Sequence, residues 1–304
     1  MSNKVYFFRS MKAALPLLAL LGGLAQPAGA YQLKDDAGHV SEWSAPPQRI
    51  VSMVPSLTET VCALGACARL VGVDRYSNHP PQVAALPKLG GIDDSNIETI
   101  VALRPDVVLV SPSSRMAERL QALGLKVVTL ESKSYADVRR VLGKTAQLLA
   151  VQDTDRLWRG IEAGVGAAAQ SLPPAARSAR VYYEVASGPY GAGESSFIGE
   201  IIARLGARNI IPASMGPFPK INPEFVVRAN PDVIMVGSRD AEGITARPGW
   251  ERISAVRRQQ ICVFSREEGD VLVRPGPRLA EAAQIMARCL REHSGGGDKS
   301  GTPR

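Results

Sequence analysis

The sequence predicts an α/β fold in which two Rossmann-like lobes are bridged by a single long α-helix. Short apolar runs alternate with amphipathic helical stretches, and such alternation is typical of parallel sheets flanked by helices. A helical pattern of about twenty residues occupies the middle of the chain. One segment of the first half also recurs, with the same spacing, in the second half. Two lobes of one plan, joined by a helix, follow from these three observations.

The strands are predicted from short runs of apolar and β-branched residues. They fall at 49–54, 107–110, 126–130, 181–185, 233–236 and 261–264. Before them, the segment from Tyr31 is expected to form a hairpin that turns near Gly38. A helix should follow the first strand directly, and Ser56 with Glu59 three residues later forms a capping-box pattern that places its start. Further helices are predicted at 116–123 and 279–290.

The bridging helix is predicted from the spacing of apolar residues at 157, 161, 165, 168 and 172. These positions fall on one helical face, and Pro173 with Pro174 ends the pattern. The helix would be about 30 Å long. The resulting domain plan is a signal peptide, an N-terminal lobe, the bridging helix, a C-terminal lobe and a disordered tail, at 1–30, 31–150, 151–173, 174–293 and 294–304.

An internal repeat is the strongest sign of two similar halves. The segment from Asn96 to Val108 matches the segment from Asn222 to Ile234. Each opens with an asparagine suited to cap a helix, carries a glutamate two residues later, and ends in a Pro-Asp pair that precedes a buried strand.

The first 30 residues have the pattern of a secretory signal. Lys4, Arg9 and Lys12 precede an apolar stretch at 13–24, and small residues up to Ala30 form a cleavage site. A membrane anchor is the alternative, but the stretch is shorter than the ~20 residues of a spanning helix. We therefore expect a periplasmic protein that begins near Tyr31, although Met11 is a second candidate for the translation start.

The charge and composition exclude some partners. The formal net charge is +7, and the leader contributes three of these positive charges. No basic run or stacking aromatic motif accompanies the rest, so nucleic acid is not an expected partner.

Four cysteines in an exported protein favour disulfides over free thiols. Three pairings are open. Cys62 and Cys67 flank a helix stop and are expected to close a local loop, which leaves Cys262 to pair with Cys289. A zinc site is the alternative, but the chain has no C-x-x-C pair and only three histidines, so no metal site is predicted.

Several motifs, taken in order, resemble the cobalamin and ferric-siderophore class of periplasmic substrate-binding proteins, the helix-bridged class III receptors. The resemblance covers nearly all of the mature chain. It depends on 49–59, Leu64-Gly65, 71–74, 76–81, 89–91, both glutamate segments, Trp250 and the stretch Arg274-Pro-Gly-Pro-Arg278.

The resemblance implies a non-enzymatic, monomeric receptor that carries a metal chelate to an ABC importer. Cobalamin or a related corrinoid is the first expectation, and haem or a ferric siderophore is the alternative. Glu98 and Glu224 match the glutamates that, in this family, dock on the two permease subunits. Each is also an ordinary glutamate in a first helical turn, where the helix dipole favours it.

The ligand-binding residues are expected in loops that face the space between the lobes. Tyr76, Tyr190 and Phe218 match aromatic contact positions of the cobalamin receptor, and flat rings suit a flat macrocycle. Ile92 and Phe218 stand where that receptor has tryptophans, so at these two positions the chain departs from the cobalamin receptor.

Polar contacts are expected beside these rings. Pro55, Ser56 and Leu57 begin a helix whose N–H groups are available to ligand oxygens, and Arg239 follows a strand at the same edge. The alternative for Ser56 is that it only caps the helix, and the alternative for Arg239 is that it lies in a solvated loop without contacting the ligand.

Two other functions, that of a hydrolase and that of a free-metal receptor, find less support in the sequence. A secreted α/β hydrolase would need a nucleophile with a partner, but the chain has no G-x-S-x-G or H-E-x-x-H motif. A receptor for free zinc or manganese would need converging histidines, whereas His39, His79 and His293 lie far apart in sequence.

Overall fold

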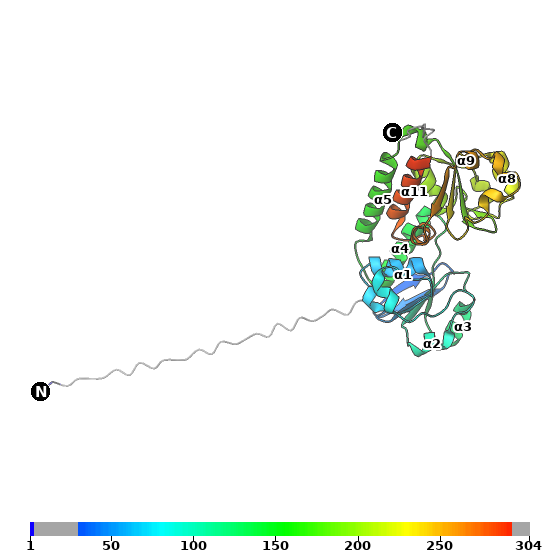
Figure 1. Ribbon diagram of the computed structural model, residues 1–304. Coiled ribbons are helices and arrows are strands. Elements are labelled where there is room, and N and C mark those ends of the chain that lie inside the picture. Colours follow the sequence, from blue (N-terminus) through cyan, green and yellow to red (C-terminus); the bar gives the residue numbers. More distant parts are fainter. Residues whose placement is uncertain (3–29, 294–304) are drawn as a thin grey trace.

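The computed structural model shows two α/β lobes stacked one above the other (Figure 1). It describes residues 1–2 and 30–293. Residues 3–29 of the expected signal peptide and the whole expected tail at 294–304 therefore lie outside the described residues. The described part of the chain has no helix that is both long enough and apolar enough to cross a bilayer.

The first lobe is built on a four-stranded parallel sheet. Its strands, in spatial order, are β4 (Leu70–Val73), β3 (Ile50–Ser52), β5 (Val107–Val110) and β6 (Val127–Thr129). The helices around it are α1 (Pro55–Ala63), α2 (Ile97–Ala102), α3 (Met116–Ala122) and α4 (Tyr135–Leu149).

Alternation along the strands divides the apolar residues between two faces of this sheet. Ile50 and Leu109 enter a core that contains α1 and α4, whereas Val51 and Val108 enter a separate core with α2 and α3. Strands buried on both faces read as continuous apolar runs, which is why the sequence revealed them.

The second lobe repeats this plan with a mainly parallel sheet. Its order is β11 (Ile261–Phe264), β10 (Val233–Gly237), β7 (Arg180–Ala186) and β8 (Tyr190–Gly191), with β9 (Arg208–Asn209) also paired to β7. Only the β7–β8 pairing in this sheet is antiparallel. Its helices are α6 (Pro174–Arg177), α7 (Phe197–Arg204), α8 (Pro223–Ala229), α9 (Ser254–Arg257), α10 (Arg266–Leu272) and α11 (Leu279–His293).

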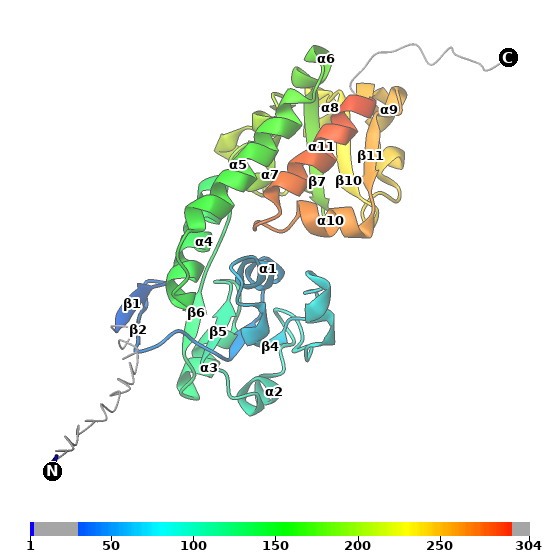
Figure 2. The ribbon, with the colours of Figure 1, turned by 90° about the vertical axis from the view of Figure 1, so that its left-hand side faces the viewer.

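A single helix, α5 (Thr154–Gln170), bridges the lobes. It starts beside the C-terminal end of α1 and runs along the second lobe next to α11 (Figure 2). The two helices pack tightly at Gly164, where an added Cβ would lie 2.6 Å from the Cβ of Ala280. Only glycine permits this approach, so Gly164, which weakens the helix in isolation, serves its packing against α11.

The apolar cores of the two lobes are continuous through α4 and α5. One cluster of buried side chains contains Leu109 of the first sheet, Val141 of α4, Val165 of α5 and Tyr183 of the second sheet. Relative movement of the lobes must therefore disturb packed apolar surface, not only bend a linker.

The repeated segments adopt matching structures. Asn96 caps α2 by accepting a hydrogen bond from Thr99, and Asn222 caps α8 by accepting one from Glu224. The aspartates of the two Pro-Asp pairs then accept a backbone N–H at the start of a neighbouring strand. Asp106 accepts from Arg49, just before β3, at 2.8 Å, and Asp232 accepts from Arg180, the first residue of β7, at 2.9 Å. The residue before each of these prolines also has a left-handed φ of 47° in both lobes.

A hairpin of β1 (Tyr31–Lys34) and β2 (Val40–Trp43) precedes the first lobe, as predicted. Gly38 in its turn has a φ of +89°. The hairpin packs on α4, because Leu33 and Trp43 are buried in the common core.

The predicted capping box at Ser56 is wrong. The helix begins at Pro55, with Val54 as the N-cap residue and no side-chain cap. Proline has no N–H and its fixed φ suits the first helical turn, so α1 starts two residues earlier than it would with Ser56 as its N-cap. Glu59 is committed elsewhere, to two arginines of the second lobe.

Both disulfides have the predicted pairing. Cys62 is bonded to Cys67 at the end of α1, and Cys262 of β11 is bonded to Cys289 of α11. Each therefore fixes a helix end to the structure next to it, one in each lobe.

Candidate functional site

A cleft of about 480 Å³ lies between the two lobes. Its walls are the segments that follow the carboxyl ends of β3, β5, β6 and β10, where open α/β sheets bind ligands. The first lobe contributes 54–57, Tyr76, Ser111, Ser113 and 130–133, and the second contributes Phe218, Arg239, Asp270 and 273–275. This volume is within the usual range of small-molecule sites.

Six of the eight residues predicted to contact the ligand line this cleft: Pro55, Ser56, Leu57, Tyr76, Phe218 and Arg239. The other two do not. Tyr190 lies on β8, its ring close to Gly188, and Ile92 lies on an exposed loop. Both side chains are well exposed, but neither belongs to the cleft wall.

Two aromatic rings enter the cleft from opposite lobes. Tyr76 is 55% exposed and therefore free to meet a ligand, with the guanidinium of Arg75 6.0 Å from its ring centroid. Phe218 is half-buried and rests against Phe197, with ring centroids 6.0 Å apart. The cleft thus has an accessible ring, that of Tyr76, and a ring held in place by packing, that of Phe218.

The N-terminal end of α1 forms part of the same wall. None of the described side chains caps it, so its polarity is directed at the cleft and not at a neighbouring residue. The positive end of the helix dipole favours oxygen atoms of a ligand there.

The loop that carries Tyr76 is held in place by the buried carboxylate of Asp74. Asp74 accepts hydrogen bonds from the backbone N–H of Tyr76, at 2.8 Å, and from the hydroxyl of Ser77. The Ser77 hydroxyl also lies 2.9 Å from that of Thr58 on α1. Burial raises the pKa of Asp74, although the hydrogen bonds from Ser77 and Tyr76 oppose the shift.

A buried ionic cluster joins the lobes directly behind the cleft. Glu59 of α1 is 2% exposed and lies between two arginines of the second lobe. One of its oxygens is 2.9 Å from Arg274, and both accept hydrogen bonds from Arg278, at 2.7 and 3.0 Å. Bidentate geometry of this kind is the strongest form of the arginine–carboxylate pair.

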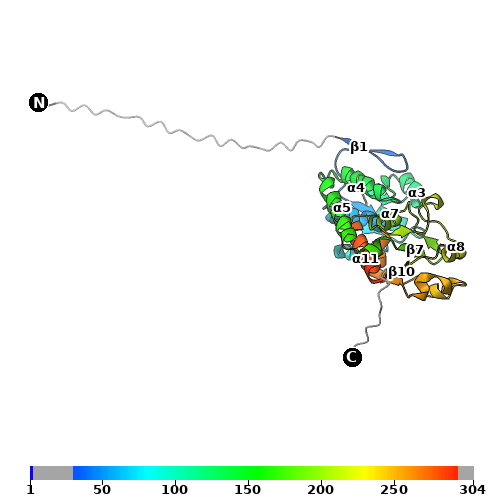
Figure 3. The same ribbon diagram turned by 90° about the horizontal axis from the view of Figure 1, so that it is seen from above.

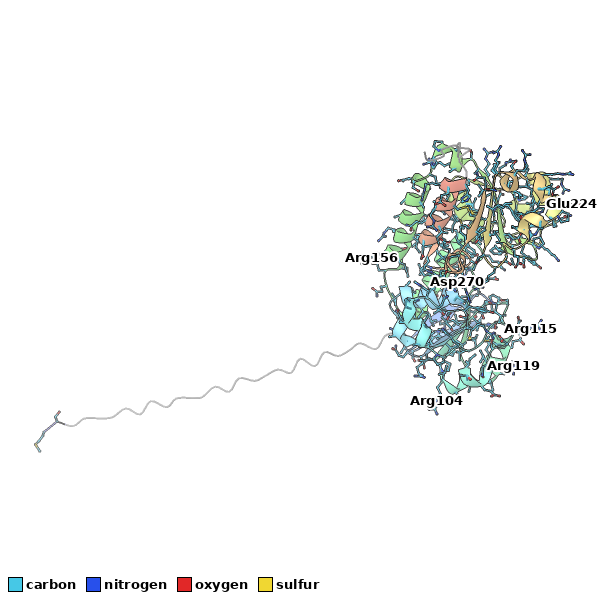
Figure 4. All side chains as sticks on the ribbon, in the orientation of Figure 1. Arg104, Arg115, Arg119, Arg156, Glu224 and Asp270 are labelled. Carbon is cyan, nitrogen blue, oxygen red and sulfur yellow. A yellow bond between two sulfur atoms is a disulfide. The ribbon has the colours of Figure 1, made fainter. Side chains whose placement is uncertain are left out.

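Arg274 extends the cluster into the cleft wall. Besides Glu59, its guanidinium donates to the side-chain oxygen of Asn78 and to the carbonyl of Tyr76, at 2.7 and 2.9 Å. It also pairs with Asp270, at 2.9 Å, and Figure 4 shows Asp270 between the two lobes. The position of the Tyr76 loop thus depends on a residue of the opposite lobe.

The ionic cluster is the part of the site that the sequence pattern does not predict. The Arg274-to-Arg278 stretch is a motif to which the pattern gives no role, and the pattern favours a cap for Glu59. A glutamate on an apolar helix face is a signal for a buried charge that needs a partner, but sequence alone does not identify a partner 215 residues away.

Glu98 and Glu224 are both exposed, one on each lobe. Glu98 is in the first turn of α2, at the end of the first lobe farthest from the second (Figures 1 and 2). Glu224 is on α8, on the side of the molecule away from α5 (Figures 1 and 3), and lies 4.0 Å from Arg228.

Comparison with known proteins agrees with this architecture. A family model described as a periplasmic binding protein matches residues 50–266, well over half of the chain. The chain belongs to the periplasmic binding protein family. Members of this family are substrate-binding receptors, not enzymes, and the expectation of a non-enzymatic protein is confirmed.

Individual relatives of this periplasmic binding protein are moderately similar to it. The vitamin B12-binding protein of Pectobacterium carotovorum is 28% identical over 263 residues, covering 82% of this chain and 91% of its own. An uncharacterized ABC transporter substrate-binding lipoprotein of Bacillus subtilis, YvrC, is 27% identical and covers 80% of each chain. The solved heme-binding protein RhuT of Roseiflexus sp. RS-1 has a TM-score of 0.68 at 26% identity, over 82% of this chain and 99% of its own.

Loss of the buried charge at Glu59 is expected to destabilise the protein strongly. Glu59→Gln leaves two guanidinium groups without their carboxylate, and removing one partner of a buried pair costs about 3–5 kcal/mol. The free energy of unfolding, measured by urea denaturation, should fall by this amount.

Glu281→Gln is the matched control, because Glu281 is half-exposed and lies 3.7 Å from the same Arg278. It should cost less than about 1 kcal/mol. Equal, small losses in both variants would contradict a role for the buried cluster in joining the lobes.

Proposed function

We propose that the protein is a periplasmic receptor that binds cobalamin or a related corrinoid in the cleft between its lobes and delivers it to an ABC importer. The observation that carries the proposal is the cleft itself, with Tyr76 and Phe218 entering it from opposite lobes. A flat macrocycle placed between the lobes buries a large apolar area against such rings.

The polar lining also suits a corrinoid. The cleft wall contains the side chains of Ser56, Ser111, Ser113 and Ser132, together with the uncapped end of α1. Hydroxyl and backbone groups are neutral hydrogen-bonding partners, and the rim of a corrin ring carries neutral amides that can both donate and accept. The Pectobacterium relative is a vitamin B12-binding protein, which is in line with this choice.

Haem is the second candidate, and one observation favours it. The phenol of Tyr76 is exposed in the cleft, where it can approach a ferric ion, and Arg239 in the same wall can pair with a carboxylate. The solved heme-binding relative has the same fold. A ferric siderophore would use the same two groups.

Titration with cyanocobalamin, haemin and a ferric hydroxamate, followed by absorption spectroscopy, separates these candidates. Cyanocobalamin is expected to bind in a 1:1 ratio and most tightly. Tyr76→Ala and Phe218→Ala should each weaken its binding roughly 10- to 100-fold, since each removes an aromatic side chain from the contact.

Tyr190→Ala is the control, because Tyr190 is also exposed but lies outside the cleft wall. It should leave the affinity unchanged. Tighter binding of haemin, with a tyrosinate-to-iron absorption band that disappears in Tyr76→Ala, would replace the corrinoid with haem.

We further propose that Glu98 and Glu224 dock the loaded receptor on the two subunits of an ABC permease dimer. They are exposed carboxylates, one held by a short helix in each lobe, and α2 and α8 occupy matching places in the internal repeat. Charges placed in this way orient a partner and speed its encounter while contributing modestly to affinity.

Charge reversal at both glutamates tests the docking role. The double variant Glu98→Arg, Glu224→Arg should bind cyanocobalamin like the wild type but reduce transport into permease-containing proteoliposomes at least about tenfold. Docking through carboxylates requires cationic groups on the permease, and the introduced arginines would repel them. Glu118→Arg with Glu251→Arg, at exposed positions in the same two lobes, is the control. Wild-type transport by the first variant would refute the docking role.

A further inference from the structure

A smaller side pocket of about 110 Å³ opens from the cleft into the second lobe. It lies at the carboxyl ends of β7, β10 and β11 and is bordered by 183–185, 237–240 and residues of α10. Arg239, Asp270 and Val273 line both cavities, so the two spaces adjoin. A ligand in the cleft can therefore extend a substituent into the pocket.

The carboxylates around this pocket are already engaged. Glu184 is fully buried and accepts two hydrogen bonds from Arg247, at 2.6 and 2.7 Å. Asp240 accepts from the backbone N–H of Ser187, at 2.8 Å. Asp270 is held by Arg274.

Two arginine side chains of the pocket, in contrast, have no partner among the described residues. Arg239 and Arg266 are both exposed, and within residues 30–293 neither guanidinium makes a hydrogen bond or an ion pair. Each offers up to five N–H donors in a planar fork that matches the oxygens of a phosphate or carboxylate. The pocket thus combines neutralised acids with two uncommitted guanidinium groups.

We infer that this side pocket is a subsite for an anionic oxygen group of the ligand, held by Arg239 and Arg266. The inference deepens the proposed function and depends on it for the position of the ring system. In a complete corrinoid the group would be the phosphodiester of the nucleotide loop, and in haem it would be a propionate carboxylate.

Two ligand pairs that differ in the anionic group test the subsite. Cyanocobalamin has the phosphodiester within its nucleotide loop and dicyanocobinamide lacks that whole loop, while haemin has free carboxylates and its dimethyl ester does not. In whichever pair binds, the anionic member should bind at least about tenfold more tightly, because charged hydrogen bonds are worth about 1.5–3 kcal/mol.

The double variant Arg239→Gln, Arg266→Gln should abolish this preference by weakening the anionic member alone. Its control is Arg104→Gln with Arg119→Gln, which removes the same charge from the exposed far side of the first lobe (Figure 4). Equal binding of both members to the wild type, or equal weakening of both by the variant, would overturn the inference.

A direct probe separates failure of the subsite from failure of the proposed function. Inorganic phosphate at millimolar concentration should raise the melting temperature of the wild type and of the control variant, but not of Arg239→Gln, Arg266→Gln. If cyanocobalamin does not bind while phosphate has this effect, the proposed ligand is wrong and the anion subsite stands. If phosphate stabilises all three proteins equally or none of them, the subsite is wrong.

Discussion

The buried carboxylate of Glu59 joins the two lobes of this molecule. It projects from α1 of the first lobe and is enclosed by Arg274 and Arg278 of the second. Taking three such charges out of water is costly, so the arrangement persists only because the geometry is bidentate and Arg274 finds further acceptors in Asn78, Asp270 and the carbonyl of Tyr76. The apolar core that continues through α4 and α5 also joins the two lobes.

The shape of the cleft follows from this junction. The first lobe lines the cleft with Ser56 and Tyr76, and the second lobe lines it with Phe218, Arg239 and Arg274. Arg274 contacts the Tyr76 loop, whereas Asp74 supports the same loop from within the first lobe. A pre-formed site of this kind loses little conformational entropy when a ligand binds. A rigid spacing of the lobes also holds Glu98 and Glu224 at a fixed separation, as their proposed docking role requires.

Much of the fold could be predicted from the sequence because its strands are buried on both faces. The runs at 107–110 and 261–264 coincide with β5 and β11, and the repeated Asn-to-Asp segments have the same caps and turns in both lobes. The cysteine pairing was also predictable, since one pair closes a local loop. These features depend on local patterns, which a sequence displays directly.

The missed features depend on contacts between distant segments. Ser56 and Glu59 have the spacing of a capping box, yet the helix begins at Pro55 and Glu59 pairs with Arg274 of the other lobe. Ile92 lies in a loop as expected and Tyr190 lies on β8, but neither side chain belongs to the cleft wall, because the direction of a side chain depends on tertiary contacts that the pattern does not specify. The side pocket combines residues from three strand ends, and only the folded sheet brings them together.

Small-angle X-ray scattering of the protein with and without cyanocobalamin tests most directly whether the lobes are held at a fixed spacing. The radius of gyration should change by less than about 1 Å on binding, as expected of a pre-organised complex. A compaction of several ångströms on binding would show that the lobes close about a hinge, and it would contradict the rigid junction between them.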